Sequence, residues 1–203
     1  SNYLKDQKIH KPMNFSKIKS FAKVNLALNI ISKSSKLHNI ESLVTFINLY
    51  DLILIKQIKS KKNRISFTGK FSKNINSNNT VSKLFKILDE KKLISKKFHI
   101  RIIKNIPQKA GLGGGSMNAA NILNYLIKKR LIRINKKEIL EIASFAGSDV
   151  ILGLETCNSI LTSKNLIKRF RNCKKMYTLV IKPRFGCSTK EVFSKVNKFD
   201  KAK

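Results

Sequence analysis

The strongest chemical signal in the chain is a cluster of glycines placed directly before a helix pattern. Four of the eight glycines lie between Gly111 and Gly115, and Ser116 follows them. Apolar residues spaced i, i+3, i+4 and i+7 from Ala119 predict a helix there. The first N–H groups of a helix lack intrahelical acceptors and, with the helix dipole, favour an anion. Glycines let the main chain approach phosphate oxygens closely, so this loop predicts a phosphate-binding site.

Two common phosphate motifs do not match this loop. No Gly-Lys-Ser/Thr follows the glycines, as a Walker loop requires, and no GxGxxG follows a buried apolar strand. The simpler alternative is a flexible turn that happens to be rich in glycine. We favour the phosphate site, because four of the eight glycines fall at one helix start.

The order of the elements that must position the loop predicts an α+β fold, since strands and helices do not strictly alternate. Period-two alternation over 21–30 predicts a strand with Ala22, Val24, Leu26, Leu28 and Ile30 on one face. Lys23 and Asn25 share its other face. Further expected strands and hairpins are 40–58 with a break near Asp51, a basic hairpin over 59–72, 98–102 closed by Pro107, and 177–181. Helices are expected over 81–88, after the glycine loop, from the N-cap Asn135 with Glu138 to Gly147, and over 188–196.

Composition narrows the class of protein. The 203 residues fit one large domain or one and a half ordinary ones, and an apolar fraction of 42% can fill a core. No uncharged apolar run of about 18 residues exists, so no membrane span is expected. Residues 1–12 are expected to be a leader or tag before Met13. Three scattered cysteines show no metal-ligand spacing and suit a reducing cytoplasm.

The net charge of +32 raises the possibility of a polyanionic partner. The lysines are spread along the chain, arginines are sparse, and no aromatic RNA-binding motif accompanies them. We therefore favour a biased surface and consider a nucleic-acid partner unlikely. The charge would still attract anionic substrates such as nucleotides.

Five stretches resemble motifs of the GHMP kinase superfamily, in the family's order. They are FAKVNLALNI, LHNIESLVTFINLYD, PQKAGLGGGSMNAA, GSDV and LVIKPRFGCSTKEVF, and together they extend from about Met13 to Phe193. The resemblance implies an α+β domain shared with a ribosomal protein domain, with ATP and Mg²⁺ as cofactors. The triple glycine followed by Asn-Ala-Ala is most similar to the branch that phosphorylates the 2-hydroxyl of a cytidyl-linked small molecule for non-mevalonate isoprenoid synthesis.

The resemblance also implies a catalytic pair. Asp149 is expected to be the general base that takes the hydroxyl proton, with Lys23 as the cation that holds it ionised and neutralises the transferred group. The simpler alternatives are an N-cap for Asp149 and a solvated strand lysine for Lys23. The residues expected to bind ATP are Pro107, Gln108, Lys109, Ala110, Gly111, Leu112, Gly113, Gly114, Gly115, Ser116 and Met117.

Substrate contacts are expected, by the same resemblance, at Asn25, His38, Asn118 and Phe193. His38 would read the cytosine edge and Phe193 would stack on its ring; an idle loop histidine and an ordinary core aromatic are the alternatives. No protein side chain is assigned to the metal, because phosphate oxygens and water would supply most of its ligands.

Some features depart from the family pattern. Leu37 stands where an aromatic residue is usual, and Ile151 follows GSDV where proline is usual. Residues 13–176 are expected to form the N-terminal ATP-binding domain and 177–203 the start of a C-terminal ferredoxin-like domain that is largely absent. The chain alone, a monomer or homodimer, is then expected to be feeble or inactive. The alternatives are another GHMP small-molecule kinase, an inactive fragment, or a basic nucleic-acid-binding module.

Overall fold

The fold is built on two long antiparallel strands. The computed structural model describes residues 14–33, 38–162, 166–171, 176–183, 192 and 194–200. Strands β1 (Ser16–Lys33) and β2 (His38–Ile58) pair from Ser16 opposite Ile55 to Lys33 opposite His38. The other edge of β2 is shared by β4 (Lys97–Ile103) and β5 (Asn158–Leu161), one on each half. The sheet is completed by β3 (Arg64–Thr68) beside β4 and β6 (Ile167–Phe170) beside β5.

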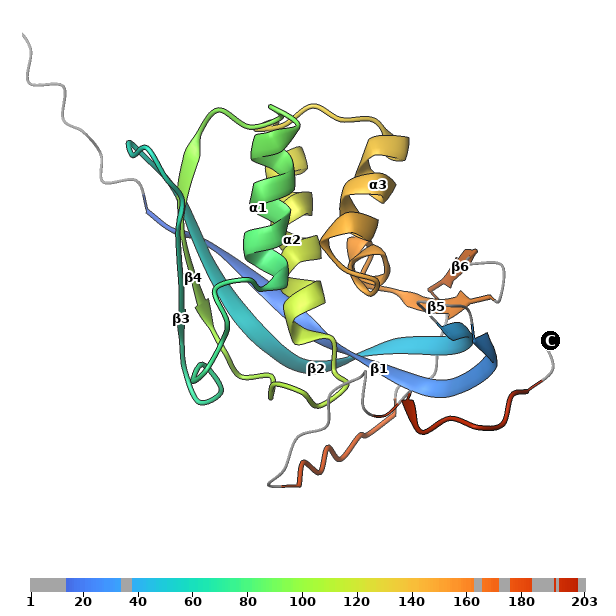
Figure 1. Ribbon diagram of the computed structural model, residues 1–203. Coiled ribbons are helices and arrows are strands. Elements are labelled where there is room, and N and C mark those ends of the chain that lie inside the picture. Colours follow the sequence, from blue (N-terminus) through green and yellow to red (C-terminus); the bar gives the residue numbers. More distant parts are fainter. Residues whose placement is uncertain are drawn as a thin grey trace, which may run out of the picture.

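Three helices cover one face of this sheet (Figure 1). They are α1 (Thr80–Glu90), α2 (Gly114–Lys128) and α3 (Lys136–Ala146), and a short 3₁₀ helix, η1 (Val150–Leu154), follows α3. Between the helices and the sheet lies the main core, with Leu84, Phe98, Ile100, Ile122 and Leu126 among its buried side chains. The α+β prediction is confirmed. None of the described helices is long and apolar enough to cross a membrane.

Local capping explains where the helices begin. At α3 the predicted N-cap is confirmed: Glu138 N donates to Asn135 Oδ1 at 3.0 Å, and Asn135 N donates to Glu138 Oε2 at 2.7 Å. The helix ends at Ala146, directly before Gly147 as expected. Asn79 and Ser82 form the equivalent capping box at α1, which begins at Thr80, one residue before the predicted start of that helix.

Three predicted strand features are wrong. β2 runs without a break through Asp51, because that side chain is buried and hydrogen-bonded instead of ending the strand. The region 59–72 is no hairpin, since β3 pairs in parallel with β4, to which α1 connects it. Residues 177–181 form no strand, and their apolar side chains Tyr177 and Leu179 are exposed. The predicted helix over 188–196 lies mostly outside the described residues.

The simple alternation predicted for β1 fails in its second half. The pairing with β2 shifts between Asn25 and Ala27, so that Leu26 is an extra residue and is 49% exposed. Such a bulge re-aims the side chains that follow it. As a result Leu28 and Ile30 line the same cleft as Lys23 instead of facing away from it.

Candidate active site

The glycine loop leads into the start of α2, as predicted, and this start lines a cleft. Gly113 is the N-cap of α2 with φ 66°, and Gly111 has φ 72°, both in the left-handed region that favours glycine. The first helical hydrogen bond runs from Met117 N to Gly113 O at 2.9 Å. The N–H groups from Gly114 to Ser116 therefore have no acceptor one turn back within α2, which is the arrangement that binds phosphate oxygens.

The loop lies directly on Lys23 of β1. Lys23 N donates to Leu112 O at 3.0 Å. A Cβ atom at Gly113 would stand 2.7 Å from Lys23 Cγ, and one at Gly114 would stand 3.1 Å from Ile106 Cγ2. Close approach therefore favours glycine at both positions, and at Gly113 the positive φ favours it as well.

Lys23 connects the loop to the predicted base. Its buried ammonium lies 3.2 Å from Asp149 Oδ2 and 3.3 Å from Asn25 Oδ1. Asn25 Oδ1 also accepts a hydrogen bond from Ser42 Oγ at 3.2 Å. Asp149 precedes η1 but makes no side-chain capping bond there, so the alternative reading of it as a helix cap is not supported. Asp149 is 36% exposed and can meet a ligand, whereas Lys23 is enclosed.

These residues line one cleft of about 920 Å³. Every residue from Pro107 to Ser116 lines it, together with Lys23, Asn25, Asn118 and Asp149. Its apolar wall comes from Leu28, Ile30, Ile40, Val44 and Leu152. The cleft thus combines the amides of a helix start, a lysine–carboxylate pair and an apolar surface.

Three of the predicted site residues are not brought into this cleft by the described structure. Met117 is fully buried beside Val44 and Leu152, so its side chain belongs to the core. His38 begins β2 opposite Lys33, but its side chain lies outside the description. Phe193 also lies outside the described residues. The cytosine-binding assignments of His38 and Phe193 therefore stay predictions.

Asp51 is the residue beside the loop that the sequence interpretation missed. It is completely buried, and its carboxylate binds the side chains of Lys104 and Asn118, which both line the cleft. One available signal was its spacing, because Asp51 shares the inward face of β2 with Ile53 and Ile55. An acidic residue on a buried face needs partners, and these are now identified.

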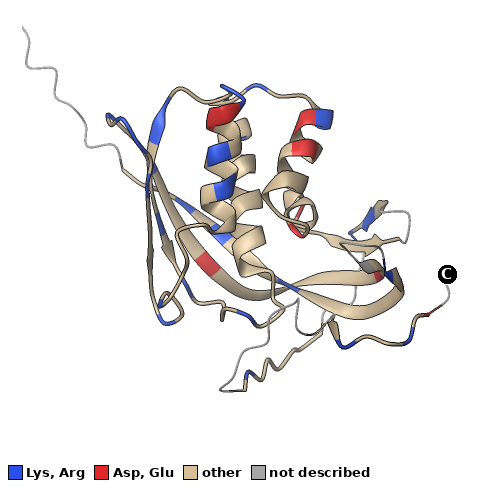
Figure 2. Ribbon diagram, in the orientation of Figure 1, with Lys and Arg blue, Asp and Glu red and all other residues tan. Residues whose placement is uncertain are grey.

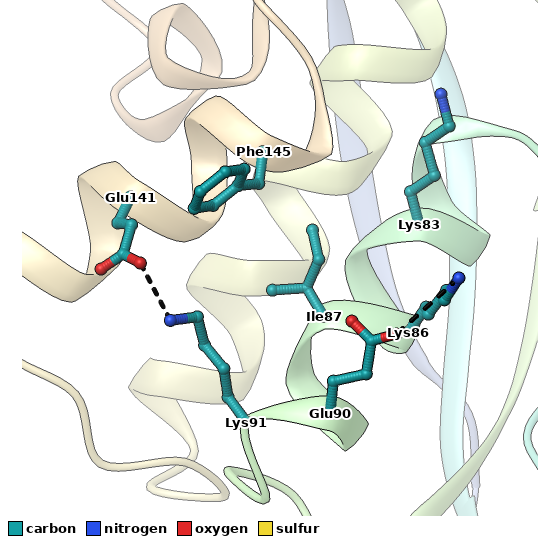
Figure 3. Close-up of a pocket in the computed structure, with 7 residues that line it drawn as sticks. All are labelled: Lys83, Lys86, Ile87, Glu90, Lys91, Glu141 and Phe145. Carbon is teal, nitrogen blue, oxygen red and sulfur yellow. Dashed lines mark hydrogen bonds and ion pairs between the residues drawn. The ribbon is translucent and has the colours of Figure 1, made fainter.

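A second hollow, of about 460 Å³, lies between α1 and α3. Figure 3 shows Ile87 and Phe145 facing it, with Lys91 Nζ and Glu141 Oε1 2.9 Å apart at its edge. None of the predicted site residues lines it. The cleft at the glycine loop is therefore the candidate active site.

Comparison with known proteins identifies the class. Residues 79–157, which include the glycine loop and Asp149, match the family model described as the GHMP kinases N terminal domain. One curated relative is 57% identical over 190 residues, covering 93% of this chain and 68% of the relative. The chain belongs to the GHMP kinase family, as its motifs predicted.

That relative is the 4-diphosphocytidyl-2-C-methyl-D-erythritol kinase of Pelagibacter ubique. A protein of the same name from Clostridium beijerinckii is 34% identical over 87% of this chain and 63% of its own length. The chain thus spans about two thirds of the length of these relatives. Both carry the name of the kinase branch that the triple glycine indicated.

Solved structures agree on the fold. A crystal structure of 4-(cytidine 5'-diphospho)-2C-methyl-D-erythritol kinase aligns with a TM-score of 0.62 and 22% identity, over 76% of this chain and 55% of that one. A mevalonate kinase from Staphylococcus aureus aligns with a TM-score of 0.52 and 15% identity, over 79% of this chain and 57% of that one. At these identities the likeness concerns the fold alone.

Proposed function

We propose that this chain forms the ATP-binding and catalytic part of a kinase for 4-diphosphocytidyl-2-C-methyl-D-erythritol. The enzyme would transfer the γ-phosphoryl group of ATP to the 2-hydroxyl of that substrate, a step in isoprenoid precursor synthesis. The name of the 57% identical relative supports the acceptor, and the glycine loop supports the donor. We further propose residues 13–176 as the ATP-binding domain and 177–203 as the start of the next domain, in a cytoplasmic monomer or homodimer.

The residues of the cleft divide the chemistry between them. The amides at the start of α2 bind the phosphates, and the Lys23 ammonium neutralises charge on the group in transfer. As the acceptor oxygen bonds to the γ-phosphorus, the bond between that phosphorus and the bridging oxygen breaks, and this oxygen leaves with ADP. Asp149 accepts the proton that the acceptor hydroxyl gives up. Positioning supplies much of the rate, because the reaction itself needs no covalent intermediate.

Magnesium fits this donor set as a partner of the nucleotide. Asn118 Oδ1 is buried and has no hydrogen-bond partner among the described residues, although Asn118 lines the cleft. An amide oxygen of this kind accepts from a metal-bound water, and the Ser116 hydroxyl lies in the first turn of the same helix. The metal would supply charge neutralisation at the phosphates.

The apolar wall of the cleft is suited to the rest of the acceptor. Leu28, Ile30 and Ile40 line the same cleft as Asn25. Ile30 pairs with Ile40 near the strand ends, where His38 begins β2. We propose that a pyrimidine ring is held at this end, with His38 reading its edge and Phe193 stacking on its face. This placement would bring the sugar-alcohol hydroxyls toward Asp149.

The observation that carries the proposal is the double contact of Lys23, to the glycine loop at Leu112 O and to Asp149 Oδ2. It supports the proposal that phosphate binding and proton removal take place in one cleft. The test is a coupled ADP-release assay on the longest natural form of the protein, with the cytidyl-linked acceptor and with free methylerythritol. We expect turnover only with the cytidyl-linked acceptor.

The Asp149→Asn variant tests the catalytic role. Asparagine is the same size but cannot take the proton, so we expect kcat to fall about 10²-fold or more while calorimetric ATP affinity changes little. Glu155→Gln, a substitution of the same type at a carboxylate outside the cleft lining, is the control. Normal turnover in Asp149→Asn would refute the assignment.

A further inference from the structure

We propose that Asp51 is a positioning residue for the phosphate loop; the proposal rests on the function proposed above. Its carboxylate is completely buried and accepts four hydrogen bonds. Oδ1 accepts from the backbone N–H groups of Asn105 and Ile106, each at 2.8 Å. Oδ2 accepts from Asn118 Nδ2 at 2.9 Å and from Lys104 Nζ. Because loss of any of these donors would leave the buried charge partly unsatisfied, the carboxylate is stable only when all four donors keep this geometry.

The four donors come from the two ends of the glycine loop. Lys104, Asn105 and Ile106 form the segment that leads from β4 into the loop, and Asn118 lies in α2 just after its first turn. Through these hydrogen bonds Asp51 attaches the segment before the loop, and the helix α2 after it, to the same position on β2. The backbone N–H groups between these two points thereby keep a fixed position relative to Lys23, as phosphate binding requires.

The carboxylate also decides which way the Asn118 amide faces. An ionised carboxylate only accepts hydrogen bonds, so the Nδ2 group of Asn118 must face Asp51. This leaves Asn118 Oδ1 as a buried acceptor without a partner among the described residues. Asp51 thereby keeps that oxygen available to accept a hydrogen bond from a group that binds together with the nucleotide.

The same carboxylate holds an ammonium at the start of α2. Lys104 is 4% exposed, and its Nζ lies 3.1 Å from the position that a Cβ atom of Gly114 would occupy. A helix N-terminus disfavours a cation, so the ammonium needs a nearby anion to stay there. Asp51 supplies that anion and keeps Lys104 beneath the loop.

The isosteric substitution Asp51→Asn separates the contacts to the backbone amides from the contacts to Lys104 and Asn118. In Asp51→Asn the side-chain oxygen can still accept from the amides of Asn105 and Ile106. Its NH₂ group offers donors in place of acceptors, so Lys104 is released and Asn118 turns its oxygen toward position 51. The matched control is Asp89→Asn, which breaks the Lys97–Asp89 pair of 2.7 Å, and neither of these two residues lines the cleft.

The experiment measures calorimetric affinity for ATP, tripolyphosphate and adenosine. We expect Asp51→Asn to weaken ATP and tripolyphosphate about tenfold or more and to leave adenosine and the Asp89→Asn control within about twofold. Unchanged tripolyphosphate affinity, or an equal loss for adenosine, would overturn the proposal. Should Asp51→Asn fail to fold, Asp51→Asn with Lys104→Met removes both buried charges, and the same selective loss is expected.

A readout without ligand separates this proposal from the proposed function. In NMR spectra of the free protein, Asp51→Asn should shift the Asn118 side-chain amide and the backbone amides from Gly114 to Ser116. If the unmodified protein binds no ATP, the proposed function fails, and these signals decide the role of Asp51 by themselves. Signals unchanged at all four groups would overturn it.

Discussion

At the scale of single residues, the site depends on how closely Lys23 approaches the glycine loop. Its backbone N–H binds Leu112 O, its side chain packs under Gly113, and its ammonium reaches Asp149. One side chain therefore sets the distance between the amides at the start of α2 and the carboxylate of Asp149. Any group added to the loop at this point must push Lys23 away.

Gly113→Ala tests this close approach. The added Cβ would stand 2.7 Å from Lys23 Cγ, so we expect ATP affinity to fall about tenfold or more, as when a supporting contact of a site is lost. Gly111→Ala is a matched control, because Gly111 also has positive φ, 72°, but a Cβ there meets nothing within 4 Å. It should lose about 1 kcal/mol of stability from backbone strain and, although Gly111 also lines the cleft, lose less ATP affinity than Gly113→Ala. Calorimetry and thermal unfolding measure both; equal affinity losses would contradict the role of the contact.

At the scale of elements, the helices and the strands are specified in different ways. α3 begins at a capping box made by residues three positions apart, Asn135 and Glu138. β1 is shaped by a bulge at Leu26 that exists only because β2 pairs with it in that register. The helix start can therefore be altered by itself, whereas a change in the bulge would move the wall of the cleft.

Asn135→Ala tests whether the capping of α3 is independent of the site. Loss of the side-chain acceptor should lower the free energy of unfolding by about 1 kcal/mol. Because α3 supplies no residue of the cleft lining, ATP affinity should stay the same. Denaturant unfolding and calorimetry measure the two effects, with Lys137→Ala as the control. A loss of affinity without a loss of stability would be inconsistent with this interpretation.

At the scale of the whole molecule, the net charge of +32 is spread over the surface. Figure 2 shows Lys and Arg on helices, strands and connecting segments instead of one element. One consequence is seen at His99, on the strand face opposite the buried Phe98 and Ile100. Burial lowers the pKa of His99 below its ordinary value of 6.5, and the nearby cations Arg101, Lys56 and Arg64 lower it further.

This shift predicts a pH effect on stability. Well above the ordinary pKa of 6.5, at about pH 8, the imidazole is neutral in both states, and His99 contributes no pH dependence. As the pH falls below that value, the unfolded chain takes up the proton more readily than the folded chain, so the folded state loses stability. His99→Gln should make the loss between about pH 7 and 5 smaller, and added salt should reduce the difference by screening. Urea unfolding across this range measures it; identical pH profiles would show that His99 does not contribute.

The sequence by itself determined the features whose causes are local. The glycine loop, the capped start of α3 at Asn135 and the family motifs depend on residues a few positions apart, so they could be predicted. Lys23 and Asn25 were correctly placed on one face of β1 for the same reason, although their catalytic and binding roles stay proposals.

Only the tertiary structure decided which distant groups meet. The pairing of β3 with β4, the bulge at Leu26 and the four donors around Asp51 depend on hydrogen bonds between segments far apart in the chain. Strand register and the partners of a buried charge have no local signature, because many pairings satisfy the same alternation. The distance of 3.2 Å between Lys23 and Asp149 is likewise a result of the folded chain, since 125 positions (149 − 23 − 1) separate them in sequence.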